Sequence, residues 1–238
     1  MATESKFSTL ESQVNEQIKP FLIEIADRLW SGHAVAMIGA GFSKNAKRIQ
    51  ENVKPFPDWA EIGDQFQEKL HGNPQEKYDN LNVPKLAEEL EASVGRPALE
   101  RFLMSEIPDT DYLPSDLHKQ LLGLPWTDIF TTNYDTLLER TSSILSDRKY
   151  DIVRTQEDLQ CAKRPRIIKL HGSFSSDRSF TITEEDYRLY PKEFAPFVNT
   201  VHQALLENTF CLIGFSGQDP NFFRWIGWIR DNLGENKS

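Results

Sequence analysis

Four short apolar runs in this chain lack a helical period, and each is followed directly by small or polar residues. The runs cover residues 34–38, 126–130, 166–170 and 209–213. Short runs of this kind, rich in β-branched residues and bounded by glycine or polar residues, are typical of buried parallel strands. Because ligands of open α/β sheets bind outside the carboxyl ends of the strands, we expect the four following segments to meet in one crevice.

Helical periodicity accounts for much of the remaining chain. Apolar residues three and four positions apart predict an amphipathic helix over residues 9–30, with an apolar face made of Val14, Ile18, Phe21, Ile25 and Leu29. From residue 126 onward strands and helices alternate, with strands at 126–131, 166–170, 179–182 and 209–215 and helices at 134–146, 193–207 and 219–233. This alternation predicts an α/β fold, a Rossmann-like parallel sheet with helices on both faces.

About ninety residues, mostly helical in pattern, separate the first strand from the second. Helices are predicted at 58–71, 84–92, 97–105 and 115–122. A simple nucleotide-binding sheet reaches its second strand after one helix, so we expect an inserted, mostly helical smaller lobe at about residues 45–122. We treat residues 1–238 as a single domain of a larger protein.

The last predicted helix contains an excess of large apolar residues, namely Phe222, Phe223, Trp225, Ile226, Trp228 and Ile229. One helical face cannot hold them all, so we expect this helix to be buried on more than one side. A homo-oligomer, a fused sensor domain or a partner protein would provide the additional contact surface.

Composition excludes several function classes. The net charge of −9 argues against a protein that binds a nucleic-acid backbone, and the nearest basic patch, residues 163–166, has the pattern of a solvated turn. The two cysteines, Cys161 and Cys211, cannot form a four-thiolate zinc site. No signal peptide and no apolar stretch long enough to cross a bilayer is present. We therefore expect a cytoplasmic protein without a metal, a membrane or a nucleic-acid partner.

The loop after the first strand suits a pyrophosphate. It reads Gly39, Ala40, Gly41, Phe42, Ser43. Glycines permit close backbone approach and a positive φ, and the following helix offers free N–H groups to an anion. The third glycine of the dehydrogenase fingerprint is absent, because Lys44 occupies that position. A plain tight turn is the alternative interpretation.

Two polar side chains follow the second strand. Asn133 and Asp135 come after Thr131 and Thr132, where the helix 134–146 is predicted to begin. Either residue can cap that helix, and a side chain at the carboxyl end of a strand can also contact a ligand. One cap needs one residue, so two candidates at the same strand end favour an additional role.

His171 and the segment from Gly214 to Asp219 follow the other two strands. His171 precedes Gly172, which permits an unusual turn, and an imidazole acts as a general base near neutral pH. A metal ligand is the alternative role for His171. Gly214 and Ser216 suit an adenosine ribose, while Asp219 is expected to cap the last helix and to lie near the cofactor.

The motifs Gly-Ala-Gly-x-Ser, Thr-Asn-x-Asp, Lys-Leu-His-Gly and Gly-x-Ser, in this order, resemble the sirtuin family over about residues 31–233. The similarity is greatest to the sirtuin-like domains of bacterial anti-phage NAD-hydrolase effectors. It implies NAD bound between the sheet and the smaller lobe, with Asn133 beside the nicotinamide ribose and His171 as general base. It further implies Asp135 near the carboxamide, the loop 39–43 on the phosphates, and Gly214 and Ser216 on the adenosine ribose.

Departures from the family narrow the activity. The four-cysteine zinc module of protein-deacylating sirtuins is absent, and Thr132 stands where those enzymes have glutamine. The segment after the first loop is longer and ends in Pro57, Asp58 and Trp59. We therefore predict an NAD glycohydrolase that releases nicotinamide and ADP-ribose. The resemblance further implies that it depletes cellular NAD in abortive infection. A deacylase or ADP-ribosyltransferase, and a non-catalytic NAD or ADP-ribose sensor, are the alternatives.

Overall fold

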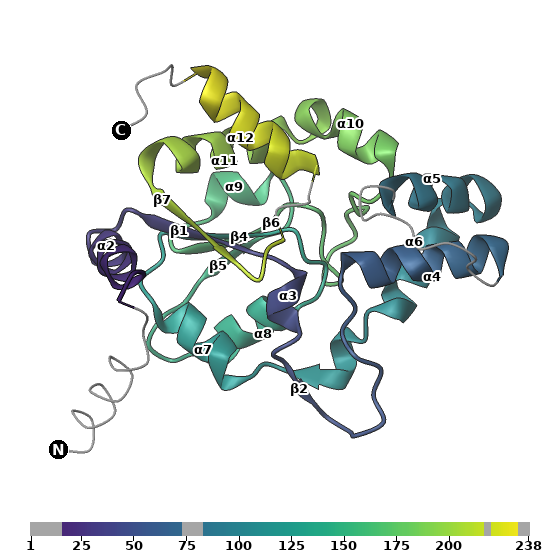
Figure 1. The fold of residues 1–238 in the computed structure, drawn as a ribbon, viewed down its shortest axis with the longest axis horizontal. Helices are drawn as coiled ribbons and strands as arrows, with labels where there is room; N and C mark the ends of the chain where they lie inside the picture. Colours follow the sequence, from purple (N-terminus) through teal and green to yellow (C-terminus); the bar gives the residue numbers. More distant parts are fainter. Residues whose placement is uncertain (1–15, 73–82, 217–219, 233–238) are drawn as a thin grey trace.

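A five-stranded parallel sheet forms the centre of the molecule (Figure 1). The structure is a computed structural model that describes residues 16–72, 83–216 and 220–232. In spatial order the strands are β5 (Asp151–Val153), β6 (Arg166–Lys169), β4 (Asp128–Thr131), β1 (Ala34–Ile38) and β7 (Thr209–Ile213). Four of them are the predicted apolar runs, whereas β5 was not predicted.

Side chains of β1 alternate between the two faces of the sheet. Val35 and Met37 enter one apolar cluster, whereas Ala34, Ala36 and Ile38 enter another. Helices α11 (Ala195–Glu207) and α12 (Pro220–Asn232) cover the first face, together with the short α9 (Asp158–Cys161). Helices α2 (Lys19–Trp30), α7 (Asp116–Gly123) and α8 (Leu137–Ile144) cover the second. The predicted Rossmann-like arrangement, with helices on both faces, is confirmed.

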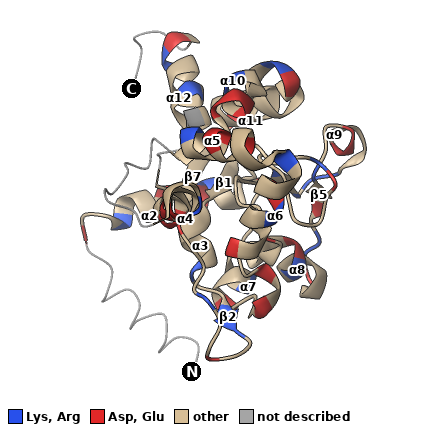
Figure 2. Cartoon of the chain, turned by 90° about the vertical axis from the view of Figure 1, so that its right-hand side faces the viewer, with Lys and Arg blue, Asp and Glu red and all other residues tan. Residues whose placement is uncertain are grey.

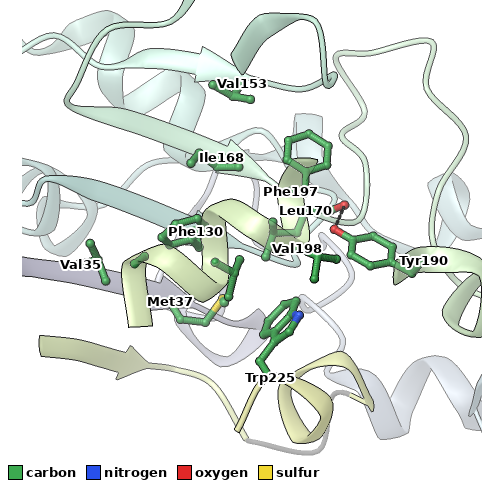
Figure 3. Packing of buried hydrophobic residues seen from close by; sticks show 12 residues of the cluster. Val35, Met37, Phe130, Val153, Ile168, Leu170, Tyr190, Phe197, Val198 and Trp225 are labelled. Carbon is green, nitrogen blue, oxygen red and sulfur yellow. Dashed lines mark hydrogen bonds between the residues drawn. The ribbon is translucent and has the colours of Figure 1, made fainter. Parts of the chain in front are cut away.

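The cluster beneath α11 and α12 shows how these helices are fixed on the sheet (Figure 3). Phe130 and Ile168 from the strands meet Phe197 from α11 and Trp225 from α12, and all four side chains are buried. Fully burying a large apolar side chain stabilises the fold by about 1.5–3 kcal/mol, so these contacts dominate the attachment of both helices.

Two sequence-based expectations about the terminal helices need correction. Asn221 and Trp225 are the buried residues among the described side chains of α12, while Phe223 and Ile226 are 58% and 43% exposed. Helix α12 is therefore buried on one side, because β7 is an edge strand and the sheet extends no further. Helix α2 begins at Lys19, exposes Phe21 and buries Leu29. Val14 lies outside the described residues.

Three helices of the inserted span form a separate lobe beside the sheet (Figure 1). They are α4 (Trp59–His71), α5 (Val83–Val94) and α6 (Arg96–Glu106). Their apolar faces share a second core that includes Phe66, Leu90 and Leu103. Arg96 links Glu91 and Glu100 to Asp186 of α10 (Glu184–Glu193), so α10 is held against the lobe.

The rest of the inserted span lies closer to the sheet. Leu121 and Leu122 of α7 pack with Trp126 on the second sheet face. A two-stranded antiparallel ribbon of β2 (Lys47–Arg48) and β3 (Tyr112–Leu113), preceded by the 3-10 turn η2 (Asp109–Asp111), connects the two parts. Within the described ranges, no helix combines the length and apolar character needed to cross a bilayer.

The predicted strand at 179–182 is wrong. Phe180 and Ile182 are buried, which explains the apolar pattern, but they pack in the core of the lobe as an irregular segment. Thr181 N–H donates to the carbonyl of His171, and Arg96 donates to the carbonyl of Phe180. This segment therefore satisfies its backbone groups through single contacts rather than through a ladder.

Candidate functional site

A cavity of about 450 Å³ lies at the carboxyl ends of β1, β4, β6 and β7. This volume is within the range of small-molecule sites. The four segments that follow these strands all contribute to its wall, with Gly39, Ala40, Gly41, Ser43, Thr132, Asn133, Asp135, His171, Gly214 and Ser216. The structure thus brings together most of the side chains that the sequence pattern selected.

One described site residue of the sequence analysis, Phe42, is not among those that line the cavity. Phe42 belongs to the short helix α3 (Ala40–Ser43), and its ring packs 4.8 Å from the ring of His118, centroid to centroid. Phe42 therefore supports the loop from behind. Asp219 lies outside the described residues.

The glycines of the first loop are needed for contact with the last strand. Gly39 N–H donates to the carbonyl of Ile213, and Gly41 N–H donates to that of Gly214. A Cβ at Gly39 would lie 2.5 Å from the Gly214 oxygen. A Cβ at Gly214, where φ is +61°, would lie 2.3 Å from the nitrogen of Phe42. The expected positive φ in the first loop is wrong, since Gly39 has a φ of −107° and Gly41 is not among the positive-φ residues.

Ser43 connects two of the candidate residues. The Asn133 amide donates to Ser43 Oγ over 3.0 Å, and Ser43 Oγ donates to Asp135 Oδ2 over 2.7 Å. The second carboxylate oxygen of Asp135 accepts from the N–H of Leu137 at the start of α8. The N-cap residue of α8 is Thr136, so the predicted cap at Asn133 or Asp135 is wrong. Asp135, one residue earlier, accepts from the first helical N–H and at the same time orients the Asn133 side chain through Ser43.

A buried ion pair supports Asp135 from the sheet side. Lys169 is 1% exposed, and its ammonium donates to the carbonyl of Asp135 over 2.5 Å and lies 3.3 Å from Glu139 Oε1. Ser173 also donates to Glu139. Burial raises the pKa of Asp135, while Lys169 and the Ser43 hydroxyl oppose this effect. The polar groups under the cavity floor thus form one connected network, which keeps Asn133 and Asp135 in fixed positions.

His171 is a neutral, almost fully buried side chain in the cavity wall. Burial, with a smaller contribution from the Arg178 guanidinium, lowers its pKa to about 3. The rings of Tyr187 and Tyr190 meet it edge-on, with centroids at 5.3 and 5.5 Å. The Asn221 amide nitrogen lies 3.1 Å from His171 Nε2. An amide nitrogen is a donor, so Nε2 accepts and the imidazole proton is on Nδ1.

The helical lobe provides a second wall of the cavity, and sequence analysis named none of its residues as site residues. Apolar side chains gather there, namely Phe56, Pro57, Trp59, Ile62 and Ile107. Asp58 caps α4 in a capping box with Glu61, and both carboxylates contact the ammonium of Lys44. The capping pattern at Asp58 was a readable helix signal, but nothing in the pattern placed it at the cavity.

Metal ligation receives no support as a role for His171. In the parts of the chain that the structure describes, no three His, Cys, Asp or Glu side chains are grouped as a metal site requires. His171 instead contacts the Asn221 amide and two tyrosine rings.

Comparison with known proteins adds a family to this geometry. Residues 127–238, which include three of the four strand-end motifs, match the model of the SIR2-like domain family. The C-terminal part of the chain is therefore similar to a SIR2-like domain. The resemblance to the sirtuin family, inferred above from the motifs, is thereby confirmed for residues 127–238.

Three curated relatives of this chain are bacterial proteins. Defense-associated sirtuin 2 of Bacillus subtilis is 25% identical over 232 residues, which cover 94% of this chain and 21% of the relative. NAD(+) hydrolase ThsA of Acinetobacter baumannii is 34% identical over 149 residues, covering 60% and 30%. NAD(+) hydrolase ThsA of Enterococcus faecium is 27% identical over 224 residues, covering 92% and 44%. The chain spans less than half the length of each of these relatives.

Proposed function

We propose that this chain is an NAD glycohydrolase module, which cleaves NAD with water to nicotinamide and ADP-ribose. The observation that carries the proposal is the Asn133–Ser43–Asp135 relay, which shares one cavity with neutral His171 in a SIR2-like domain. Two of the compared relatives bear the name NAD(+) hydrolase, which supports the same chemistry.

In this proposal the two loops that touch at Gly41 and Gly214 bind NAD. In this proposal the pyrophosphate lies along residues 39–43, and Gly214 and Ser216 contact the adenosine ribose. The nicotinamide end then lies toward Thr132 and Asp135. Asp219 remains a predicted contact, because it is outside the described residues.

The chemistry breaks the bond between the ribose C1′ and the nicotinamide nitrogen. The bonding electron pair leaves with nicotinamide, and the ribose passes through an oxocarbenium-like state before water adds to C1′. The amide nitrogen of Asn133 is engaged by Ser43, which leaves its oxygen to accept a hydrogen bond from that water. The water releases one proton as ADP-ribose forms.

His171 has the neutral state that contact with a ribose hydroxyl requires. With a pKa of about 3 it holds a proton weakly, so it serves better to orient the ribose than to store the proton from water. This reading keeps His171 in the site and refines the general-base role that the family resemblance implies.

In the cell, this activity would deplete NAD during phage infection and act as abortive-infection defence. Such a module needs control, so we propose that it acts in the cytoplasm within a longer protein or a homo-oligomer, where a sensor domain or partner triggers it. Its similarity to a protein named defense-associated sirtuin supports a defence role.

The test is incubation of the purified chain with NAD, with chromatography of nicotinamide and ADP-ribose and calorimetry of NAD binding. We expect the parent to release nicotinamide. Asn133→Ala and His171→Ala should release it at least about a hundredfold more slowly. His33→Ala, which changes an exposed histidine outside the cavity, serves as the matched control. Equal rates for all four proteins would refute the site, and absence of NAD binding by the parent would refute the function.

A further inference from the structure

Lys44 is the one Lys or Arg among the described residues that line the cavity. The other charged groups of the lining are the carboxyls of Asp58 and Asp135, and His171 is neutral. A dinucleotide brings a diphosphate dianion into this wall, and the whole chain has a net charge of −9. An anion inside the cavity therefore has a single cationic side chain available to it.

The Lys44 ammonium, in the cavity lining, is held by two carboxylates from the lobe. Nζ lies 2.8 Å from Asp58 Oδ2 and 3.3 Å from Glu61 Oε2. Lys44 directly follows Ser43, the last residue of the loop that approaches Gly214. The three side chains are 40%, 45% and 51% exposed, and ion pairs this exposed are weak and readily exchanged.

We propose that Lys44 recognises the diphosphate of the bound dinucleotide, and that Asp58 and Glu61 hold its ammonium in position when no anion is bound. The inference rests on the proposed NAD site. A lysine ammonium binds phosphate as a compact point charge, and it needs no exact fork geometry to do so.

The protonation state of Lys44 is suited to this role. The hydrogen bond to Asp58 raises the pKa of Lys44, and Glu61 adds to the effect, while partial burial opposes it. The ammonium therefore stays charged throughout the physiological range, and a phosphate that replaces the carboxylates meets a full positive charge.

A purely structural role for Lys44, as the partner of the acidic first turn of α4, makes a different prediction. If Lys44 only neutralises the acidic first turn of α4, its loss affects every ligand of the cavity equally. If it contacts the diphosphate, its loss weakens ligands with phosphate and spares those without it. Nicotinamide riboside has the same glycosidic bond as NAD and no phosphate, so it separates the two roles.

Asp58 offers a change of opposite sign. Asp58→Asn removes a negative charge beside the proposed diphosphate and leaves Glu61 as the carboxylate partner of the Lys44 ammonium. Asparagine caps helices as well as aspartate does, so α4 keeps its N-terminal cap. This variant is expected to bind phosphorylated ligands more tightly, which a damaged lobe would not do.

Lys47 provides a matched control on the same segment. It lies on β2, one of the basic positions beneath α3 (Figure 2), and pairs with the exposed Asp116. Lys47→Gln removes the same charge three residues away from Lys44, at a position that does not line the cavity.

The experiment is titration calorimetry of the whole chain with NAD, ADP-ribose and nicotinamide riboside, with thermal melts of every variant. We expect Lys44→Gln to weaken NAD and ADP-ribose about tenfold and to leave nicotinamide riboside unchanged. Lys44→Arg should bind within about threefold of the parent, Asp58→Asn should bind the two phosphorylated ligands more tightly, and Lys47→Gln should match the parent.

Two results would overturn the inference while the proposed function stands. They are unchanged NAD binding by Lys44→Gln, and an equal loss for NAD and nicotinamide riboside. If the parent binds neither NAD nor ADP-ribose, the proposed function and this inference fail together.

Discussion

The side-chain amide of Asn221 donates to His171 Nε2 over 3.1 Å, and both residues are 1% exposed. Asn221 is at the start of α12, fifty residues after His171 in the chain. Because this hydrogen bond selects the Nδ1–H form of the imidazole, the last helix determines how the most buried candidate residue presents itself to a ligand.

Removing the Asn221 amide should disturb catalysis more than binding. Asn221→Ala removes the hydrogen bond that His171 Nε2 accepts and that selects the Nδ1–H form of the imidazole. Under the proposed function we expect kcat to fall about ten- to a hundredfold with little change in KM. Steady-state kinetics with Asn232→Ala, an exposed position on the same helix, is the comparison. An unchanged kcat would show that His171 needs no such support.

The approach of the β1 and β7 loops predicts a strong effect of one methyl group. In Gly214→Ala the new Cβ meets the Phe42 backbone, and the positive φ adds strain. We expect loss of NAD binding in calorimetry while circular dichroism retains the α/β signature. Gly123→Ala is the control, since a Cβ there meets nothing within 4 Å. Parent-like binding by Gly214→Ala would contradict the packed-loop account.

A buried carboxylate at the other end of β4 should matter for stability alone. Asp128 is 0% exposed and binds Arg166 through both oxygens, with Arg164 as a further partner. Asp128→Asn leaves the Arg166 guanidinium without its counter-charge, and we expect a loss of about 3 kcal/mol in urea unfolding. NAD affinity of the folded fraction should not change, because Asp128 is far along the strand from the cavity edge. Asp116→Asn, in an exposed pair, should have no measurable effect.

Two buried histidines predict acid sensitivity. Burial lowers the pKa of His118 to about 4, with a smaller contribution from the charge of Arg140. Burial likewise lowers the pKa of His171 to about 3, with a smaller contribution from Arg178. The unfolded chain takes up these protons near pH 6.5, before the folded chain does. The contribution of the two histidines to the free energy of unfolding is therefore fully present above about pH 6.5. It falls on acidification by about 1.4 kcal/mol per pH unit for each proton.

His118→Gln tests this pH dependence. Melting temperatures between pH 7 and 4.5 should fall less steeply for the variant than for the parent, while His33→Gln, at an exposed position, should follow the parent curve. The carboxyl groups titrate in every variant alike, so the difference between curves isolates His118. Parallel curves for parent and His118→Gln would rule out its contribution.

The sheet and the cavity edge were predictable because two simple regularities coincide. Buried parallel strands are short apolar runs, and their carboxyl ends share one edge, so the residues after each run had to meet. Strand β5 was not predicted by this criterion, because it has three residues and only one fully buried side chain, Val153. Its position depends on pairing with β6, which a local pattern does not encode.

Helix α10 and the position of Asn221 are features that local sequence patterns did not predict. Helix α10 buries Tyr187 and Tyr190, is otherwise polar and contains Pro191, so its periodicity is faint. The capping box of Thr183 and Asp186 was the available signal. Asn221 follows Asp219 and Pro220, which already accounted for the predicted start of the last helix. Nothing in the sequence indicated that Asn221 contacts His171. Contacts between distant elements decided both cases.

The adjacency of β1 and β7, the first and last strands among the described residues, also fixes when the cavity can first exist during synthesis. Gly39 leaves the ribosome about 175 residues before Gly214, which corresponds to about 10–35 s at ordinary elongation rates. Until then the first loop has no Gly214 carbonyl to contact, and His171 has no Asn221. Under the proposed function, a nascent chain cannot consume NAD before its final strand and helix are made.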